Sequence, residues 1–585
     1  MESKYEKFNL ENLKLTKYLF FTGKGGVGKT SISCAIATKL ADMGKNVMLV
    51  STDPASNLQD VFETELDNKG VKIPYVPNLT VANFEPEQSA AEYRESVVGP
   101  FRGKLPDVAI ENMEEQLSGS CTVEIASFNE FSNFITDKDN YDTYDHIIFD
   151  TAPTGHALRM LELPSAWSDF IEKSKHGASC LGQLAGLKEK QEVYKMAVDT
   201  LANGEKTTLV LVARAEEAIL REAARASVEL EDIGMDRQIL IINGVLEDYD
   251  DDLSKIMYDN QREAIENIPD FLKKFDIYTV PLKSTNIASI EDLRRFFDDE
   301  EVSDVESNEE VKQTSKLRDV VEDLYKSDKK IIFTMGKGGV GKTTIAAAIA
   351  KELAKMGKKV HLTTTDPAAH IGNVIDESFG ISMSNIDEKE VLAEYREEVL
   401  KKAYETNASQ DDIDYIEEDL RSPCTQEIAV FRAFAQIVDS CEDEVIVIDT
   451  APTGHTLLLL ESTENYDREI ARTQGETPES IKKLLPKLKD ETITEVLIVA
   501  LAEATPYYEA KRLKEDLDRA GIFSKWWVIN ESYQGIETSN KLLANKAKGQ
   551  VKWINKIVEE SDNHTALVKW TPIKLQGQNL EEILD

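Results

Sequence analysis

The octapeptide Gly-Lys-Gly-Gly-Val-Gly-Lys-Thr occupies Gly23–Thr30 and returns, letter for letter, at Gly336–Thr343. Both copies fit the phosphate-loop pattern G-x-x-x-x-G-K-[ST]. Each carries an extra lysine directly after its first glycine, Lys24 in one copy and Lys337 in the other. A repeat spaced by 313 residues (336 minus 23) predicts two large homologous domains rather than several small ones.

Composition narrows the class of protein. The 585 residues carry a net charge of -39, which argues against a nucleic-acid binder because such a protein needs a basic face. An acidic, soluble surface is the plain explanation, and adaptation to high internal salt is a second one. The first residues lack the apolar core of a signal peptide, and we find no uncharged apolar run long enough to span a bilayer. The five cysteines form no C-x-x-C pair. We therefore expect a cytoplasmic protein with reduced thiols.

Short apolar runs alternate with helical stretches in both halves, which predicts an α/β fold with a mostly parallel sheet in each. Each phosphate loop follows an apolar strand and precedes a helix that ends before a glycine (Thr30–Met43 before Gly44, and the second helix to Met356 before Gly357). The predicted strands form pairs between the halves: Tyr18–Thr22 with Ile331–Met335, Val47–Ser51 with Val360–Thr364, His146–Phe149 with Val445–Ile448, Thr208–Ala213 with Val496–Leu501, and Gln238–Ile242 with Trp526–Ile529.

An acidic stretch separates the halves. Asp298–Glu310 is too poor in large apolar residues to fold alone, so we expect a mobile linker, followed by a leading helix at Thr314–Tyr325. The expected organisation is an N-terminal P-loop domain (1–297), a linker with its leading helix (298–326) and a C-terminal P-loop domain (327–585). The offset between equivalent motifs falls from 313 to 287 along the chain, so the copies are diverged duplicates.

The glycine loops predict two nucleotide sites. Backbone N–H groups of such a loop wrap a phosphate at a helix start. The loop residues assigned to this role are Gly23, Gly25, Gly26, Val27 and Gly28 in the first copy, and Gly336, Gly338, Gly339, Val340 and Gly341 in the second. Lys29 and Lys342 are expected to reach the outer phosphates of ATP, and Thr30 and Thr343 to ligate Mg²⁺. A glycine turn without a ligand is the alternative, but strand, loop and helix occur together twice.

Lys24 and Lys337 add a more specific signal. An early lysine resembles the deviant phosphate loop of ATPases that work as face-to-face dimers. In those ATPases the lysine of one half touches the nucleotide of the other, where a second cation stabilises the charge on the transferring phosphoryl group. The alternative is a solvated lysine on a loop.

Carboxylates follow the second and third predicted strands. Asp53 and Asp366 are expected to orient the attacking water or a Mg²⁺-bound water, although an Asp-Pro pair also starts turns. Asp150 and Asp449 match a Walker B carboxylate near the metal. Each opens the segment Asp-Thr-Ala-Pro-Thr-Gly-His, which is placed to sense hydrolysis.

Two asparagines end later strands. Asn243 and Asn530 offer a donor and an acceptor to the adenine edge, with Pro281-Leu282 and Pro572-Ile573 as walls for the base. Turn-forming asparagines are the alternative.

A second repeated motif contains cysteine. Cys121-Thr-Val-Glu-Ile-Ala-Ser-Phe is echoed by Cys424-Thr-Gln-Glu-Ile-Ala-Val-Phe, and apolar spacing predicts an amphipathic helix with the thiol at its start. That position lowers a thiol pKa. Cys180 has no second copy and can complete a three-thiolate site, which suits As(III) or Sb(III) better than zinc. A small buried hydrophobe is the alternative role for a cysteine, and we assign it to Cys34 and Cys441.

Together these motifs resemble the family of arsenical-pump-driving ATPases over essentially the whole chain. The resemblance implies a cytosolic, monomeric pseudodimer that binds two Mg·ATP at its interface and is stimulated by As(III) or Sb(III). It further implies a membrane arsenite permease as partner, reached from the inner face of the membrane, and allows an arsenic metallochaperone. The implied metalloid ligands and their neighbours are Cys121, Cys180, Cys424, His156, His455 and Ser422.

Two other classes share parts of this pattern. The targeting ATPase for tail-anchored membrane proteins has the deviant loop, but is usually a single-domain homodimer with a C-x-x-C zinc clasp and a Met-rich groove. A partitioning ATPase that assembles on DNA or membrane is the third possibility. The missing C-x-x-C, the fusion of two halves and the lack of a basic patch argue against both.

Overall fold

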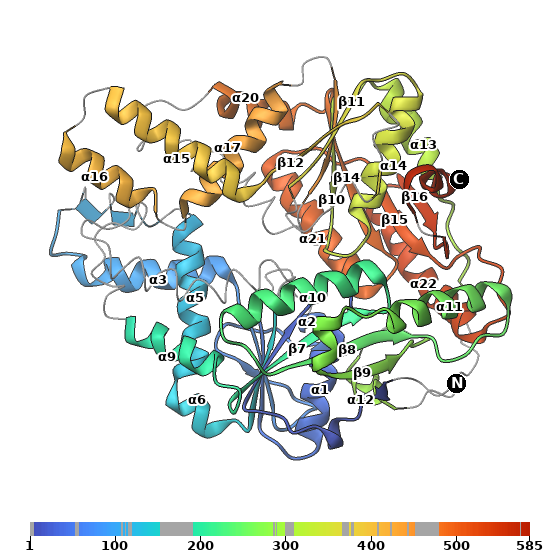
Figure 1. Ribbon diagram of the computed structural model, residues 1–585, viewed down its shortest axis with the longest axis horizontal. Coiled ribbons are helices and arrows are strands. Elements are labelled where there is room, and N and C mark those ends of the chain that lie inside the picture. Colours follow the sequence, from blue (N-terminus) through green and yellow to red (C-terminus); the bar gives the residue numbers. More distant parts are fainter. Residues whose placement is uncertain are drawn as a thin grey trace.

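Two parallel sheets form the cores of a two-part molecule in the computed structural model (Figure 1). The structure describes residues 5–52, 58–106, 109–110, 113–114, 117, 120–151, 191–284, 287, 289–298, 309–365, 374–375, 380–405, 409–421, 424–440, 444–450, 479–573 and 575–585. We call residues 5–298 the first half and residues 309–585 the second half. In Figure 1 the first half, blue to green, lies below the second, yellow to red.

The first sheet has nine strands, and all its pairings are parallel except β4 with β5. Its order is β1 (Glu6–Lys7), β9 (Asp276–Pro281), β8 (Gln238–Val245), β7 (Thr207–Arg214), β2 (Tyr18–Thr22), β6 (His146–Asp150), β3 (Val47–Ser51), β5 (Leu79–Asn83) and β4 (Val71–Lys72). The central strands are fully buried because helices cover both faces.

The second sheet has seven strands, all parallel. Its order is β12 (Ser382–Asn385), β11 (Val360–Thr364), β13 (Val445–Asp449), β10 (Ile331–Met335), β14 (Thr494–Leu501), β15 (Trp527–Ser532) and β16 (Thr565–Lys569). The order β3-β6-β2-β7-β8-β9 of the first sheet recurs as β11-β13-β10-β14-β15-β16. This confirms the predicted duplication of a P-loop α/β fold.

Helices cover both sheets and line the junction of the halves. The first half contains α1 (Lys29–Asp42), α2 (Leu58–Phe62), α3 (Pro86–Val98), α5 (Ser120–Thr136), α6 (Lys138–Thr143), α9 (Gln191–Leu201), α10 (Glu217–Asp232), α11 (Asp252–Glu266) and α12 (Ile290–Arg295). The second half contains α13 (Leu317–Lys326), α14 (Lys342–Lys355), α15 (Glu388–Glu405), α16 (Gln410–Asp419), α17 (Cys424–Ser440), α20 (Glu479–Lys489), α21 (Ala504–Ala520) and α22 (Lys541–Glu560).

The helices that contain the repeated cysteines project to one side of the molecule. Figure 1 shows α3, α5 and α9 of the first half on the same side as α15, α16 and α17 of the second. No helix in the described part of the chain is both long and apolar enough to cross a membrane.

All the predicted strands occur, within a few residues of the expected bounds. The leading helix begins at Leu317, not at Thr314, because the backbone N–H of Ser315 donates to the carbonyl of Thr565 and extends the second sheet. The sequence did not predict the edge strands β1, β4, β12 and β16, nor β5 and β9, which lie next to an edge of the first sheet. The predicted acidic linker, apart from residues 298 and 309–310, lies outside the described residues.

Candidate nucleotide sites at the junction of the halves

The two phosphate loops have the same backbone conformation as well as the same sequence. Gly28 and Gly341 precede α1 and α14 with φ of 93° and 88°, in the left-handed region that favours glycine. The Lys29 ammonium donates to the carbonyl of Gly23 at 2.9 Å, and the Lys342 ammonium donates to that of Lys337 at 3.0 Å. In each loop the lysine side chain therefore folds back onto the loop backbone. A bound phosphate would compete with these carbonyl groups for the ammonium.

The donor set beside the second loop fits magnesium. The Thr343 hydroxyl donates to Oδ2 of Asp449 at 2.6 Å, and Asp449 is the buried last residue of β13. Asp150 ends β6 in the same way and is equally buried. A hydroxyl and a carboxylate are the hard oxygen ligands that Mg²⁺ prefers, so the residues present fit the ion.

Several predicted residues lie outside the described part of the chain. They are Asp53, Asp366 and the segments that follow Thr151 and Thr450, with His156 and His455. Their proposed roles remain predictions.

The two asparagines anchor the phosphate loops to neighbouring strands. The amide Nδ2 of Asn243 donates to the carbonyl of Val27 at 2.9 Å, and that of Asn530 donates to Val340 at 2.9 Å. Asn243 lies within strand β8 and Asn530 within strand β15, so the alternative that these asparagines form turns is wrong. One N–H of each amide is committed to the loop, which leaves the second N–H and the amide oxygen for adenine recognition.

The two phosphate loops contact each other directly across the junction. A Cβ atom at Gly25 would lie 2.1 Å from the carbonyl carbon of Gly338, and one at Gly339 would lie 1.8 Å from the carbonyl oxygen of Gly25. Side chains at these positions would clash with the other half. Glycine is therefore required here by the contact between the halves as well as by phosphate binding.

Each early lysine pairs with a glutamate of its own half. Lys24 Nζ lies 3.0 Å from Oε2 of Glu222 on α10, and Lys337 forms the equivalent ion pair with Glu509 on α21. That either lysine also reaches a nucleotide bound by the other half remains a prediction. The glutamates were missed because neither stands in a recognisable motif.

Hydrogen bonds join the halves at the starts of α11 and α22. Asp251 caps α11 through the backbone N–H of Ser254, and it also accepts from Thr538 Oγ1 at 2.6 Å and from the Ser539 N–H at 2.7 Å. Burial acts to raise the pKa of Asp251, but hydrogen bonds from Ser254, Thr538 and Ser539 outweigh it and hold the pKa well below its usual range. Asp250 adds a bond from Asn540.

The repeated cysteines stand at helix starts, as predicted: Cys424 opens α17 and Cys121 is the second residue of α5. An arginine fixes the chain before each. Arg94 Nε donates to the carbonyl of Leu117 at 3.2 Å, and Arg396 Nε donates to that of Leu420 at 2.8 Å. Both carbonyls precede the cysteine by four residues. The other predicted thiol-site residues, Cys180 and Ser422, lie outside the described residues.

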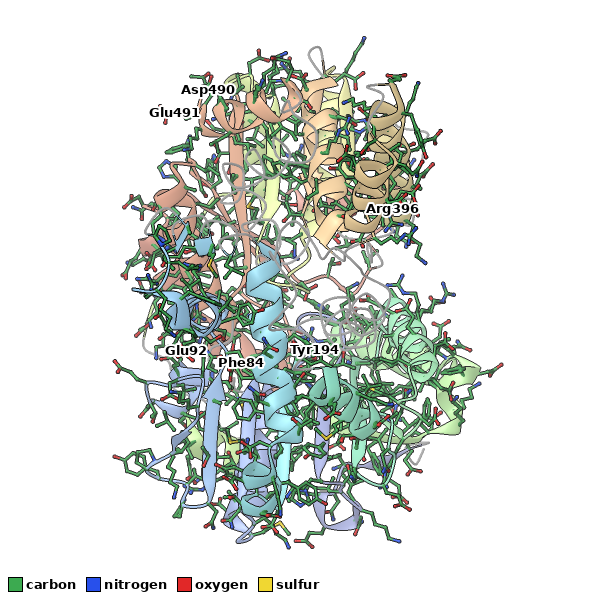
Figure 2. All side chains as sticks on the ribbon, turned by 90° about the vertical axis from the view of Figure 1, so that its left-hand side faces the viewer. Phe84, Glu92, Tyr194, Arg396, Asp490 and Glu491 are labelled. Carbon is green, nitrogen blue, oxygen red and sulfur yellow. The ribbon has the colours of Figure 1, made fainter. Side chains whose placement is uncertain are left out.

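Aromatic packing holds α5 in place. Figure 2 labels Phe84 and Tyr194 beside this helix. Phe84 packs on Phe134 at 5.3 Å between ring centroids, and Tyr194 packs on Phe128 at 4.6 Å and donates to Asn129. The thiol-bearing helix is therefore rigidly seated on the first half.

Cys34 behaves as the predicted core residue. It is 1% exposed in α1, and burial, with the nearby Asp150 carboxylate, raises the pKa of its thiol well above the usual value. Such a thiol is a poor nucleophile and ligand. Cys441 lies outside the described residues.

Two P-loop folds with facing phosphate loops define a tandem P-loop ATPase. A family model described as an anion-transporting ATPase matches residues 16–299, 329–477 and 469–583. The chain belongs to this family, and it is an ATP hydrolase.

Named relatives extend this comparison. The chain is 45% identical over 559 residues to an arsenical pump-driving ATPase of Escherichia coli, covering 94% of this chain and 95% of the relative. It is 33% identical to a putative arsenical pump-driving ATPase of Halobacterium salinarum over 94% of this chain and 91% of the relative. An ATPase GET3 of Debaryomyces hansenii is 29% identical over 48% of this chain and 88% of its own length.

Proposed function

We propose that this chain hydrolyses Mg·ATP at two sites between its halves, and that the hydrolysis drives extrusion of arsenite or antimonite through a membrane permease. The observation that carries the proposal is the direct contact of the two glycine loops, at Gly25 and Gly338, in a chain similar over 94% of its length to an arsenical pump-driving ATPase. Hydrolysis at such a junction can open and close the halves.

The phosphate end of each site has clear roles for this chain's residues. The loop backbone and Lys29 or Lys342 bind the phosphates, and Thr30 or Thr343 with Asp150 or Asp449 holds Mg²⁺, which neutralises charge on the phosphates. We assign Asp53 and Asp366 to the attacking water.

Lys24 and Lys337 would complete the sites from the opposite half. To do so, each ammonium must exchange the carboxylate of Glu222 or Glu509 for a phosphate. In the state without nucleotide, the two glutamates keep the lysines within their own halves. Nucleotide binding then favours the state in which each lysine contacts a phosphate bound by the other half.

We assign the metalloid to a thiol site built from both halves. Cys121, Cys180 and Cys424 would bind As(III) or Sb(III), with His156, His455 and Ser422 nearby. Because α5 and α17 belong to different halves, a shared ion would draw the halves together. Metalloid and nucleotide binding are then coupled, and each tightens the other by the same factor.

The proposed setting follows from this function. The protein acts in the cytoplasm and binds the permease at the inner face of the membrane, as a monomeric pseudodimer, with an arsenic metallochaperone as a possible source of the ion. The net charge of -39 disfavours nucleic acid as a partner. Targeting of tail-anchored proteins is the weaker alternative, because the ATPase GET3 relatives match only about half of the chain.

The test is the ATPase rate with and without arsenite or antimonite. Wild type should be stimulated, Cys424→Ser should lose the stimulation, and Cys34→Ala should keep it as the matched control. An unstimulated wild type would reject the metalloid pump. Stimulation that survives Cys424→Ser would remove this residue from the thiol site.

A further inference from the structure

The two nucleotide sites share their loops but differ at the end predicted to hold the base. Two equivalent hydrogen bonds, one in each half, show which residues of the two halves correspond to each other. The backbone N–H of Leu246 donates to Oε1 of Gln261 at 2.7 Å, and that of Tyr533 donates to Oε1 of Gln550 at 2.8 Å. Leu246 and Tyr533 each lie three residues after the asparagine that anchors the loop. Gln261 of α11 therefore corresponds to Gln550 of α22.

This alignment makes Gly549 the counterpart of Asn260. The amide Nδ2 of Asn260, in the first half, donates at 3.0 Å to the carbonyl of Pro572, in the second. Pro572 belongs to the segment predicted to wall the base of the second site. Gly549 has no side chain with which to make the reciprocal contact to Pro281. The second site therefore receives a contact that the first does not.

A second difference lies at the ends of β7 and β14. The backbone N–H of Glu216 bonds the carbonyl of Arg214 at 2.8 Å, and that of Glu503 bonds the carbonyl of Leu501 at 2.8 Å, so Arg214 and Leu501 are equivalent. Arg214, the last residue of β7, interacts electrostatically most strongly with Glu216 of its own half, and then with Glu531 and Glu503 of the second half. Leu501 is uncharged, so it cannot make the reciprocal interaction with the first half.

The third difference is the residue after each anchoring asparagine. Gly244 and Glu531 occupy the same irregularity in β8 and β15, with φ of 77° and 51°. A glutamate in this left-handed conformation costs about 1 kcal/mol more than glycine. A Cβ at Gly244 would meet Leu282 at an ordinary 3.6 Å, so lack of room does not explain the glycine. Glu531, the residue after Asn530, thus adopts this conformation despite its backbone cost, and its carboxylate is attracted by Arg214.

We propose that Arg214 and Asn260 are positioning residues of the second nucleotide site, supplied across the junction by the first half. Arg214 orients Glu531, the residue that follows the anchoring Asn530, and Asn260 holds Pro572, so that both segments contact the nucleoside. The first site lacks this support because Leu501 and Gly549 stand in its place. The inference rests on the proposed nucleotide sites and makes them unequal: binding of the nucleoside at the second site depends on contact between the halves.

The test uses the full chain with one site disabled at a time. Lys29→Ala disables the first loop and Lys342→Ala disables the second. Into each background we introduce Arg214→Leu with Asn260→Gly, the residue types of the opposite half, and measure binding of Mg·ADP and of inorganic tripolyphosphate by calorimetry. Tripolyphosphate has no nucleoside, so it reports on the loop alone.

In the Lys29→Ala background the double change should weaken Mg·ADP binding about ten-fold, the loss expected for one or two hydrogen bonds, and leave tripolyphosphate binding unchanged. In the Lys342→Ala background Mg·ADP binding should not change. Arg214→Lys, which keeps the charge, should retain most of the affinity.

Equal losses of Mg·ADP affinity in both backgrounds, or an equal loss of tripolyphosphate affinity, would overturn the inference. Such a result would mean that these residues only stabilise the contact between the halves. If wild type bound no Mg·ADP, the proposed function itself would fail, and this inference with it.

Discussion

Replacing Gly25 by alanine tests the contact between the phosphate loops with a single methyl group. The backbone φ of Gly25 lies outside the left-handed region, so alanine brings no strain within its own loop. The new Cβ would lie 2.1 Å from the carbonyl carbon, 2.3 Å from Cα and 2.4 Å from the oxygen of Gly338. Ordinary contact begins at 3.4 Å, so the loops must separate by at least 1.3 Å (3.4 minus 2.1).

Catalytic groups displaced by about 1 Å lose about 100-fold in rate, because reaction requires close alignment of the reacting atoms. We therefore expect Gly25→Ala to reduce the steady-state ATPase rate by about that factor while each half still binds Mg·ADP. Gly549→Ala is the matched control, since its Cβ meets no described atom within 4 Å and alanine favours a helix. A Gly25→Ala enzyme with near wild-type turnover would show that the loops do not approach this closely during catalysis.

Three further predictions follow from the same contacts. Asp251→Ala removes the cap of α11 and the carboxylate oxygen that accepts hydrogen bonds from Thr538 and Ser539 of the second half, so it should cost about 2–4 kcal/mol and lower the melting temperature by about 3–6 °C. Asp252→Ala removes only a first-turn charge and should change the melting temperature little. Equal shifts in melting temperature for the two variants would contradict the bridging role of Asp251. Burial between the halves raises the pKa of Glu531 to about 7, against the attraction of Arg214 and with repulsion from Glu216 and Glu503. The folded state then holds a proton that the unfolded state releases, so stability falls as pH rises from about 5 to 7. As pH rises over that range, the melting temperature of Glu531→Gln should increase relative to that of wild type. A difference that does not depend on pH would refute this assignment. In the native protein Cys34 should resist alkylation by iodoacetamide, as peptide mapping can check, and rapid labelling would contradict its burial.

The sequence alone predicted the duplicated α/β fold and the phosphate loops because these features are local. A buried strand, a glycine loop and a helix start are encoded by residues within about one turn or strand of each other. The same locality placed Cys121 and Cys424 at helix starts. For Asn243 and Asn530 the sequence predicted contact with adenine, which stays a prediction, whereas their bonds to Val27 and Val340 depend on the packing of distant strands.

Only the tertiary structure decided how the halves meet. Asp251 and Thr538 are 287 residues apart, and no sequence pattern links them, nor Asn260 with Pro572 or Arg214 with Glu531. The leading helix starts late because Ser315 joins a strand 251 residues further along the chain (566 minus 315). The sequence by itself determined two identical phosphate loops. Their contact and the unequal surroundings of the two sites arise from the packing of one half against the other, because pairing across a junction depends on shape and charge that are assembled only when both halves are folded.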